Sequence, residues 1–195
     1  MEKIKKLRSL LKDLNIDGYI VPKNDEFFGE YIPEYKDNLK FISNFSGSFG
    51  FALILQKKNY LFVDGRYTLQ AKIQCGNFFD IKTIPKCLPG DVLKNKRLKI
   101  GFDPRLHTGK SLSYFFQKTK CKLTSINYNL IDKIWEKKKN NKINKFFVLK
   151  NNDAGQNFEK KIYQLTKILN KKKIDIQFIS ASENIAWLLN IRGKD

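Results

Sequence analysis

The sequence predicts an α/β fold, with a mixed β-sheet flanked by helices and a truncated second copy of the same pattern behind it. Three observations predict this class. Short apolar runs alternate with amphipathic helical segments through residues 1–135, as the strands and helices of an α/β domain do. Two of the runs follow each other closely, as the strands of a hairpin do. Residues 162–179 then repeat the apolar pattern of residues 4–21 at one constant offset.

The first segment predicts an amphipathic helix followed by a buried strand. One apolar face at spacings of three and four is formed by Ile4, Leu7, Leu11 and Leu14, which is helical periodicity. Asp17-Gly18 ends the helix, and the run 19–21 reads as a short strand that Pro22 stops. Residues 23–40 are polar and rich in turn formers, so we expect a loop there.

The middle of the first segment predicts a β-hairpin and a helix. The apolar runs 51–55 and 60–63 enclose the polar stretch 56–59, which is the pattern of two strands and their turn. Residues 66–74 suit a helix that carries Leu69 and Ile73 inward.

Four further elements complete the predicted domain. Residues 78–84 alternate like a strand, and residues 98–102 form another strand, ending at Asp103-Pro104. Residues 109–118 can be helical, and residues 122–126 are a short strand. Strands interleaved with helices indicate a sheet covered by helices, and they exclude a pure helical bundle or a β-sandwich.

A charged stretch marks the boundary to the second copy. Residues 136–145 read EKKKNNKINK, without an apolar face, which is typical of a solvated linker. We therefore expect a domain at 1–135, a linker at 136–145 and an incomplete second domain at 146–195. The residues that repeat the first helix and the segment after its end are Ile162, Leu165, Ile168, Leu169, Ile174 and Asp175. A strand is then expected at Phe178-Ile179. This second copy stops before its own hairpin, so we expect it to be less ordered than the first.

The net charge of +19 would attract nucleic acid or an anionic surface. The basic residues are overwhelmingly Lys, however, and the few arginines are Arg8, Arg66, Arg97, Arg105 and Arg192. Base-reading sites favour the planar fork of Arg, and scattered Lys with much Asn, Ile and Phe is what an AT-rich genome produces. Nucleic acid is thus not the expected partner. Coding bias and a selected polyanion site both stay open.

Cysteine usage and the N-terminus indicate a cytoplasmic location. Cys75, Cys87 and Cys121 form no CxxC motif and are odd in number, which argues for a reducing compartment. The first residues mix charge with apolar side chains and do not resemble a signal peptide. No run of about 18 apolar residues occurs, so no membrane span is expected.

The sequence offers few groups for chemistry. A hydrolytic metal site needs three or more His, Asp, Glu or Cys ligands, and the chain has one histidine, His107; we expect no catalytic and no metal-binding residues. The glycine-rich segment 46–50 lacks the spacing of a phosphate loop, so a tight turn is expected.

Asp64-Gly65-Arg66-Tyr67 places an acid, a flexible residue, an Arg and a Tyr where a strand ends. Either Arg66 binds a ligand carboxylate there or it pairs with Asp64.

Six strings together resemble the aminopeptidase P family, in family order and at family-like spacing. They are Tyr31 to Tyr35, Phe41 to Ser48, Asp64 to Ala71, Gly101 to Leu106, Asn129 to Trp135 and Ile185 to Gly193. The resemblance covers essentially the whole chain. It implies a creatinase/aminopeptidase P N-terminal-like domain and the beginning of a second such domain, both placed before a catalytic domain.

The resemblance also implies a function for the parent protein. The long form of the family is similar to a cytosolic, homodimeric Xaa-Pro aminopeptidase, a metallopeptidase that removes the residue preceding proline with two divalent metal ions, usually manganese. The metal ligands and catalytic histidines belong to the third domain, and no position here matches them. N-terminal residues of relatives approach the catalytic cleft, which suggests substrate-binding roles for Arg66, Tyr67 and Arg192. The alternative is a non-enzymatic peptide- or polyanion-binding module, as in a histone-chaperone subunit that carries an inactive aminopeptidase-P-like region.

Overall fold

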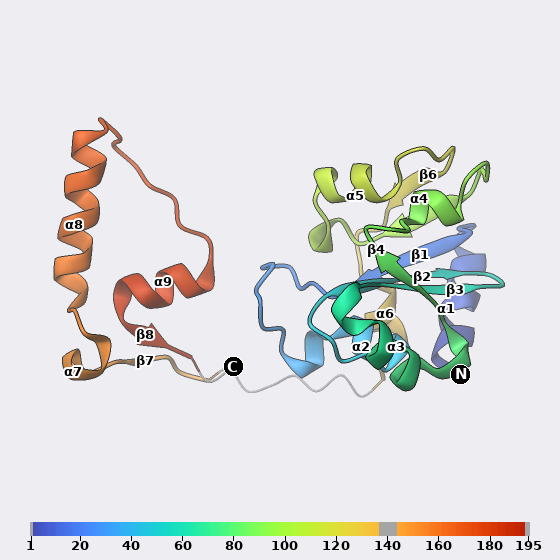
Figure 1. Ribbon diagram of the computed structural model, residues 1–195, viewed down its shortest axis with the longest axis horizontal. Helices are drawn as coiled ribbons and strands as arrows, with labels where there is room; N and C mark the ends of the chain where they lie inside the picture. The colour runs from blue at the N-terminus through green and yellow to red at the C-terminus, as the bar shows by residue number, and fades with distance from the viewer. Residues whose placement is uncertain (1, 137–143, 194–195) are drawn as a thin grey trace. The chain divides into compact units, whose positions relative to one another are not determined.

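The computed structural model describes residues 2–136 and 144–193 of the chain. The chain divides into two compact units, residues 1–140 and 141–195, which we describe separately (Figure 1). Most of the predicted linker at 136–145 lies outside the described residues, so its role as a linker stays a prediction.

The first unit is built on a six-stranded sheet in the order β4-β3-β2-β1-β5-β6. Its strands are β1 (Gly18–Pro22), β2 (Gly50–Leu55), β3 (Asn59–Asp64), β4 (Asp80–Ile84), β5 (Lys99–Phe102) and β6 (Lys122–Ser125). Strand β2 is antiparallel to β1 and to β3, whereas every other neighbouring pair is parallel. Five strands therefore run one way, and their carboxyl ends share one edge of the sheet with the start of β2. We call it the carboxyl edge.

Helices cover both faces of this sheet (Figure 1). One face packs on α1 (Glu2–Asp13), α2 (Asn38–Ser43), α3 (Thr68–Cys75) and α6 (Leu130–Ile134), the other on α4 (Pro89–Val92) and α5 (Gly109–Phe115). Successive side chains of β1 enter opposite layers: Tyr19 and Val21 lie in the core with α1, and Ile20 lies in the core with α5. That alternation follows from the period of two along a strand. The predicted mixed sheet flanked by helices is confirmed.

Short 3-10 helices form part of the connections between the strands of the first unit. They span Glu34–Lys36, Gly65–Tyr67, Gly76–Phe78 and Pro104–Leu106. The second starts directly after β3 and the fourth one residue beyond the end of β5, so both lie at the carboxyl edge.

The second unit contains β7 (Phe147–Val148), α7 (Asn151–Ala154), α8 (Phe158–Lys171), α9 (Ser182–Leu189) and β8 (Ile191–Arg192). Strands β7 and β8 pair antiparallel, and the prediction from sequence did not include them. None of the described helices is long and apolar enough to cross a membrane.

The ends of α1 and α8 share one backbone hydrogen-bond pattern, which supports the internal repeat. Behind α1, Asn15 has φ 52°, and the N–H of Ile16 donates to the carbonyl of Leu11 at 2.9 Å. Behind α8, Lys173 has φ 55°, and the N–H of Ile174 donates to the carbonyl of Leu169 at 3.0 Å. Both are Schellman C-caps, with a left-handed residue one position before the donor.

The repeat does not extend to the following strand. A strand at Phe178-Ile179 was expected, but the structure forms none there, and Phe178 is 84% exposed. The equivalent strand of the first unit, β1, pairs with β2 and β5, and the described part of the second unit offers no such partners. The prediction was wrong because a strand needs neighbours to satisfy its backbone.

The helix α3 buries a different face from the predicted one. Leu69 and Ile73, expected inward, are 71% and 74% exposed, while Ala71 and Cys75 lie in the core. The helix begins at Thr68 after a 3-10 turn, and its small residues face the sheet. Hydrophobicity alone therefore predicted the wrong buried face for α3.

Candidate functional site at the carboxyl edge

The turn after β3 holds Arg66 in a fixed geometry on Asp64. The backbone N–H of Arg66 donates to Asp64 Oδ1 at 2.9 Å, and Arg66 Nη2 donates to Asp64 Oδ2 at 2.6 Å. Arg66 Nε lies 3.2 Å from both carboxylate oxygens. The hydrogen bonds from Arg66 lower the pKa of the Asp64 carboxyl. The pairing that sequence analysis weighed as the alternative is thus present.

The guanidinium of Arg66 nevertheless faces solvent. Its side chain is 74% exposed, and it lies over the ring of Tyr67, 5.3 Å from the ring centroid. An ion pair this exposed contributes little to stability, about 0–1 kcal/mol. Arg66 therefore exposes its cationic guanidinium to solvent beside the ring of Tyr67. Its hydrogen bonds to Asp64 set the orientation of the guanidinium.

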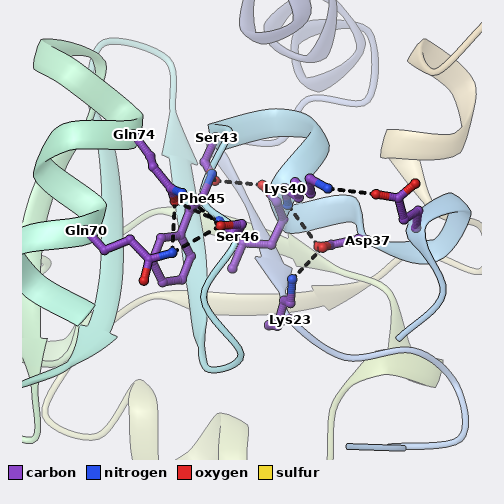
Figure 2. Close-up of polar contacts among 10 residues, drawn as sticks. Lys23, Asp37, Lys40, Ser43, Phe45, Ser46, Gln70 and Gln74 are labelled. Atoms are coloured by element: carbon purple, nitrogen blue, oxygen red, sulfur yellow. Dashed lines mark hydrogen bonds and ion pairs between the residues drawn. The ribbon is translucent and has the colours of Figure 1, made fainter. Parts of the chain in front are cut away.

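The glycine-rich segment 46–50 lies beside this turn. The hydroxyls of Ser48 and Tyr67 are 2.7 Å apart. Ser46 Oγ accepts hydrogen bonds from Gln70 Nε2 at 3.0 Å and Gln74 Nε2 at 2.8 Å, as Figure 2 shows. The loop before β2 is therefore pinned to α3.

Gly47 makes this loop possible. A Cβ at Gly47 would lie 2.2 Å from the Cζ atom of Phe45, and Phe45 is fully buried. No other residue fits without displacing that ring. The segment acts as a tight turn into the sheet, as expected, and its two serine side chains are hydrogen-bonded to Tyr67, Gln70 and Gln74.

A buried ion pair fixes the end of β1 against α2 (Figure 2). Lys23 Nζ bonds to Asp37 Oδ2, and the two side chains are 11% and 8% exposed. Asp37 Oδ1 accepts the backbone N–H of Lys40 at 3.0 Å and so caps α2. This pair holds the segment between β1 and α2 in place at the carboxyl edge.

A second Asp-x-Arg clamp follows β5, and sequence reasoning did not single it out. Asp103 Oδ1 accepts the backbone N–H and Nε of Arg105, both at 3.0 Å, and Asp103 Oδ2 accepts Nη2 at 2.8 Å. The carboxylate of Asp103 is 1% exposed, whereas the Arg105 side chain is 58% exposed. The shared spacing of Asp64-Gly65-Arg66 and Asp103-Pro104-Arg105 was the signal that could have revealed it.

The single histidine of the chain, His107, is half-buried just after β5. His107 packs edge-on against Phe102, with ring centroids 5.9 Å apart, and its Nε2 has no hydrogen-bond partner. Burial lowers the pKa of His107 to about 4, against a smaller opposing effect of Asp103. His107 is therefore neutral at pH 7.

The third predicted site residue, Arg192, lies in the second unit. Its Nη1 donates to the carbonyls of Ala186 at 3.0 Å and Ile191 at 2.8 Å. Its proposed role beside Arg66 and Tyr67 stays a prediction.

Across residues 2–136 and 144–193, no group of three or more His, Cys, Asp or Glu side chains could hold a metal ion. The described residues therefore do not fit the divalent metals that the resemblance implies.

Sequence comparison finds relatives that are named as Xaa-Pro aminopeptidases. The chain is 35% identical over 205 residues to a probable Xaa-Pro aminopeptidase P of Paracoccidioides brasiliensis (strain Pb03), covering 100% of this chain and 33% of the relative. A probable Xaa-Pro aminopeptidase P of Laccaria bicolor is also 35% identical over 206 residues, covering 100% of this chain and 32% of the relative. The chain thus spans about a third of the length of these relatives.

Solved structures show the same fold. The X-prolyl aminopeptidase of Caenorhabditis elegans, a cytosolic enzyme with a di-nuclear active site, superposes with a TM-score of 0.82 at 31% identity, covering 100% of this chain and 35% of that one. The N-terminal domain of the cytoplasmic peptidase PepQ of Mycobacterium tuberculosis superposes with a TM-score of 0.52 at 19% identity, covering 68% of this chain and 98% of that one. At that identity the second likeness concerns the fold alone.

Fold and carboxyl edge together define an open, mixed α/β domain that gathers polar side chains where its parallel strands end. Sequence models described as the creatinase/prolidase N-terminal domain match residues 3–134 and 137–195. The chain belongs to the creatinase/prolidase N-terminal domain family, and its homologues over the full chain are Xaa-Pro aminopeptidases.

Proposed function

We propose that this chain is the N-terminal, non-catalytic portion of a metal-dependent Xaa-Pro aminopeptidase, which removes the residue preceding proline. The observation that carries the proposal is the likeness to Xaa-Pro aminopeptidases over 100% of the chain, at 35% identity in sequence and a TM-score of 0.82 in structure. In this role the chain contributes to domain packing, to homodimer formation and to substrate access. The partners of the proposal are a catalytic domain, a second copy of the enzyme and peptides with proline at the second position.

The two divalent metals of the proposed parent enzyme, expected to be manganese, have no ligand set among the residues described here. We derive no catalytic step for this chain. Its proposed contribution is binding and orientation.

Within that function, Arg66 is the residue proposed to face the substrate. Asp64 engages Nε and Nη2 of Arg66, so a substrate group would meet the remaining guanidinium edge and the ring of Tyr67. The clamp fixes the guanidinium plane before substrate arrives, which reduces the entropy cost of binding. A lysine there would keep the charge but lose the planar fork.

The test replaces Arg66 with Lys in the complete enzyme. A substrate role predicts a fall in kcat/KM that corresponds to about 1–3 kcal/mol, with the melting temperature nearly unchanged. The matched control is Arg97→Lys, because Arg97 is an exposed residue just before β5, away from the carboxyl edge. A lowered melting temperature with unchanged activity per folded molecule would assign Arg66 a structural role only.

The competing function is a non-enzymatic peptide- or polyanion-binding module. The net charge of +19 favours it. A complete enzyme that cleaves no Xaa-Pro peptide, yet binds polyanions in a salt-dependent way, would support this module against the peptidase.

A further inference from the structure

Strand β6 is an outer strand of the six-stranded sheet, and one side of its backbone is free. It pairs with β5 alone, and the N–H of Lys122 donates towards β5, to the carbonyl of Leu98 at 2.8 Å. The backbone groups of successive residues point to opposite sides of a strand, so those of Leu123 and Ser125 point away from β5. Among the described residues, none donates to or accepts from these outward groups.

The other outer strand of the sheet, β4, differs from β6 in two ways. The carbonyl of Thr83 accepts the N–H of Cys87 at 2.9 Å, so the chain after β4 returns to the strand. Lys82 of β4 forms an ion pair with Asp80 at 2.9 Å. Exposed outer strands invite pairing with other chains, and proteins commonly cover or protect them. Within this sheet, β6 is therefore the strand that offers itself for further pairing.

The charge around β6 has one sign. Residues 104–131, which include all of β6, contain no acid. Lys118, Lys120 and Lys122 are exposed, and none of them forms an ion pair with a described residue. Lys99 of β5, also exposed, lies directly beside Lys122 in the register of the two strands. Like charges at neighbouring positions of a sheet repel each other, so an anionic partner would stabilise this arrangement.

The lysines decide which strand this edge accepts. A β6 strand from a second copy would bring Lys122 against an equally basic strand, and the two would repel. A strand that carries Asp or Glu would instead be attracted. Asp17 also reaches this end of β5, but its Oδ2 accepts the backbone N–H of Lys99 at 2.8 Å. Nucleic acid would meet the same charges, yet it has no peptide backbone to pair with a strand.

We infer that β6 binds an extended acidic peptide as a seventh strand of the sheet. The backbone of the peptide would pair with Leu123 and Ser125, and its carboxylates would lie beside Lys99 and Lys122. These two lysines start from one face of the sheet, and side chains alternate between faces along a strand. The site therefore favours peptides with an acid at every second residue. The inference does not rest on the proposed peptidase function.

The experiment measures amide hydrogen exchange of the chain by NMR, with and without an acetylated and amidated peptide that alternates Glu and Val. The matched control peptide has Lys in place of each Glu. At several times the Kd of the acidic peptide, exchange of the Leu123 and Ser125 amides should slow at least about 5-fold, because paired amides exchange only when the peptide leaves. Exchange of Ile81 in β4 should not change, and the Lys peptide should protect none of these amides.

Two further probes separate backbone pairing from attraction between charges. A fully N-methylated form of the acidic peptide and a thymidine oligodeoxynucleotide are both anionic, but neither donates a backbone N–H. Neither should slow the exchange of Leu123 or Ser125. On the protein, Ser125→Pro removes one outward N–H and spares the ladder with β5, as proline does on outer strands. It should weaken binding of the acidic peptide about 5-fold, with the melting temperature nearly unchanged.

Charge reversal tests the role of the lysines. Lys120→Glu combined with Lys122→Glu should abolish the response to the acidic peptide and create one to the Lys peptide. The control, Lys57→Glu combined with Lys58→Glu, makes the same charge change in the exposed turn between β2 and β3, which β1 and β5 separate from β6. It should leave the response to the acidic peptide nearly unchanged.

Any of three results overturns the inference. The first is unchanged exchange of Leu123 and Ser125 up to about 1 mM acidic peptide. The second is equal protection by the N-methylated peptide or by the oligonucleotide, which would indicate a site for polyanions in general. The third is an equal loss of binding in the two charge-reversed variants.

Discussion

Lys161 and Asn190 join the two main helices of the second unit through a buried contact. Lys161 Nζ donates to Asn190 Oδ1 at 2.6 Å and to the carbonyl of Trp187 at 2.7 Å. It also lies 4.4 Å from the centroid of the Trp187 ring. Lys161 is 5% exposed and Asn190 is 3% exposed. The ammonium of α8 thus neutralises the negative end of α9, where the last carbonyls lack helical partners.

Lys161→Met should loosen the second unit while leaving the first unit intact. Met preserves the length of the side chain but leaves two acceptors unpaired, at a cost of about 1–3 kcal/mol. Hydrogen exchange should therefore speed up for amides of α8 and α9 but not for those of β1 to β3. Lys160→Met, at the exposed neighbouring position, is the control. Equal exchange in the two variants would show that the contact does not stabilise the unit.

Gly90 and Gly109 should respond in opposite ways to alanine. A Cβ at Gly90 would lie 2.2 Å from the carbonyl oxygen of Gln117, whereas a Cβ at Gly109 meets nothing within 4 Å. Gly90→Ala must displace the backbone and should cost about 1–3 kcal/mol. Gly109→Ala, at the start of α5, should be neutral or stabilising by up to about 1 kcal/mol. Urea denaturation measures both changes, and equal effects would contradict this packing of α4.

Much of this architecture could be predicted from sequence, because its signals are local. The run 51–55 and the run 60–63 predicted β2 and β3 within one residue at each end. Helix α2 was missed because its buried face, Leu39 and Ile42, is short and lies in a polar stretch. The exposure of Leu69 could not be predicted, since it depends on how α3 lies on the sheet.

The polar sites at the carboxyl edge, too, could be predicted from the sequence only in part. The Asp64–Arg66 turn was visible as a string, since both residues lie within three positions of one another. The hollow beside the loops that follow β1 and β5 was not visible, because Asp25, Asn38, Asp103 and Asn129, which line it, meet only through the order of the strands. Sequence spacing does not report which loops a sheet brings together.

His107 should make stability depend on pH between about 4 and 6.5. Its pKa falls from 6.5 to about 4 on burial, so the unfolded chain binds the proton more readily than the folded chain. Stability is therefore complete above pH 6.5 and is lost as the pH falls towards 4, by about 3 kcal/mol in total. His107→Leu should remove this share of the slope. Wild-type and variant curves that stay parallel across this window would exclude the effect.

The claim that catalysis lies outside this chain is tested most directly by a hydrolysis assay. The purified chain is incubated with the peptide Arg-Pro-Pro and Mn²⁺, and free arginine is measured against a protein-free blank. The account predicts no release above the blank, because the chain has one histidine and the described residues form no group that could hold a metal. Release of arginine that requires Mn²⁺ and scales with the amount of chain would contradict it.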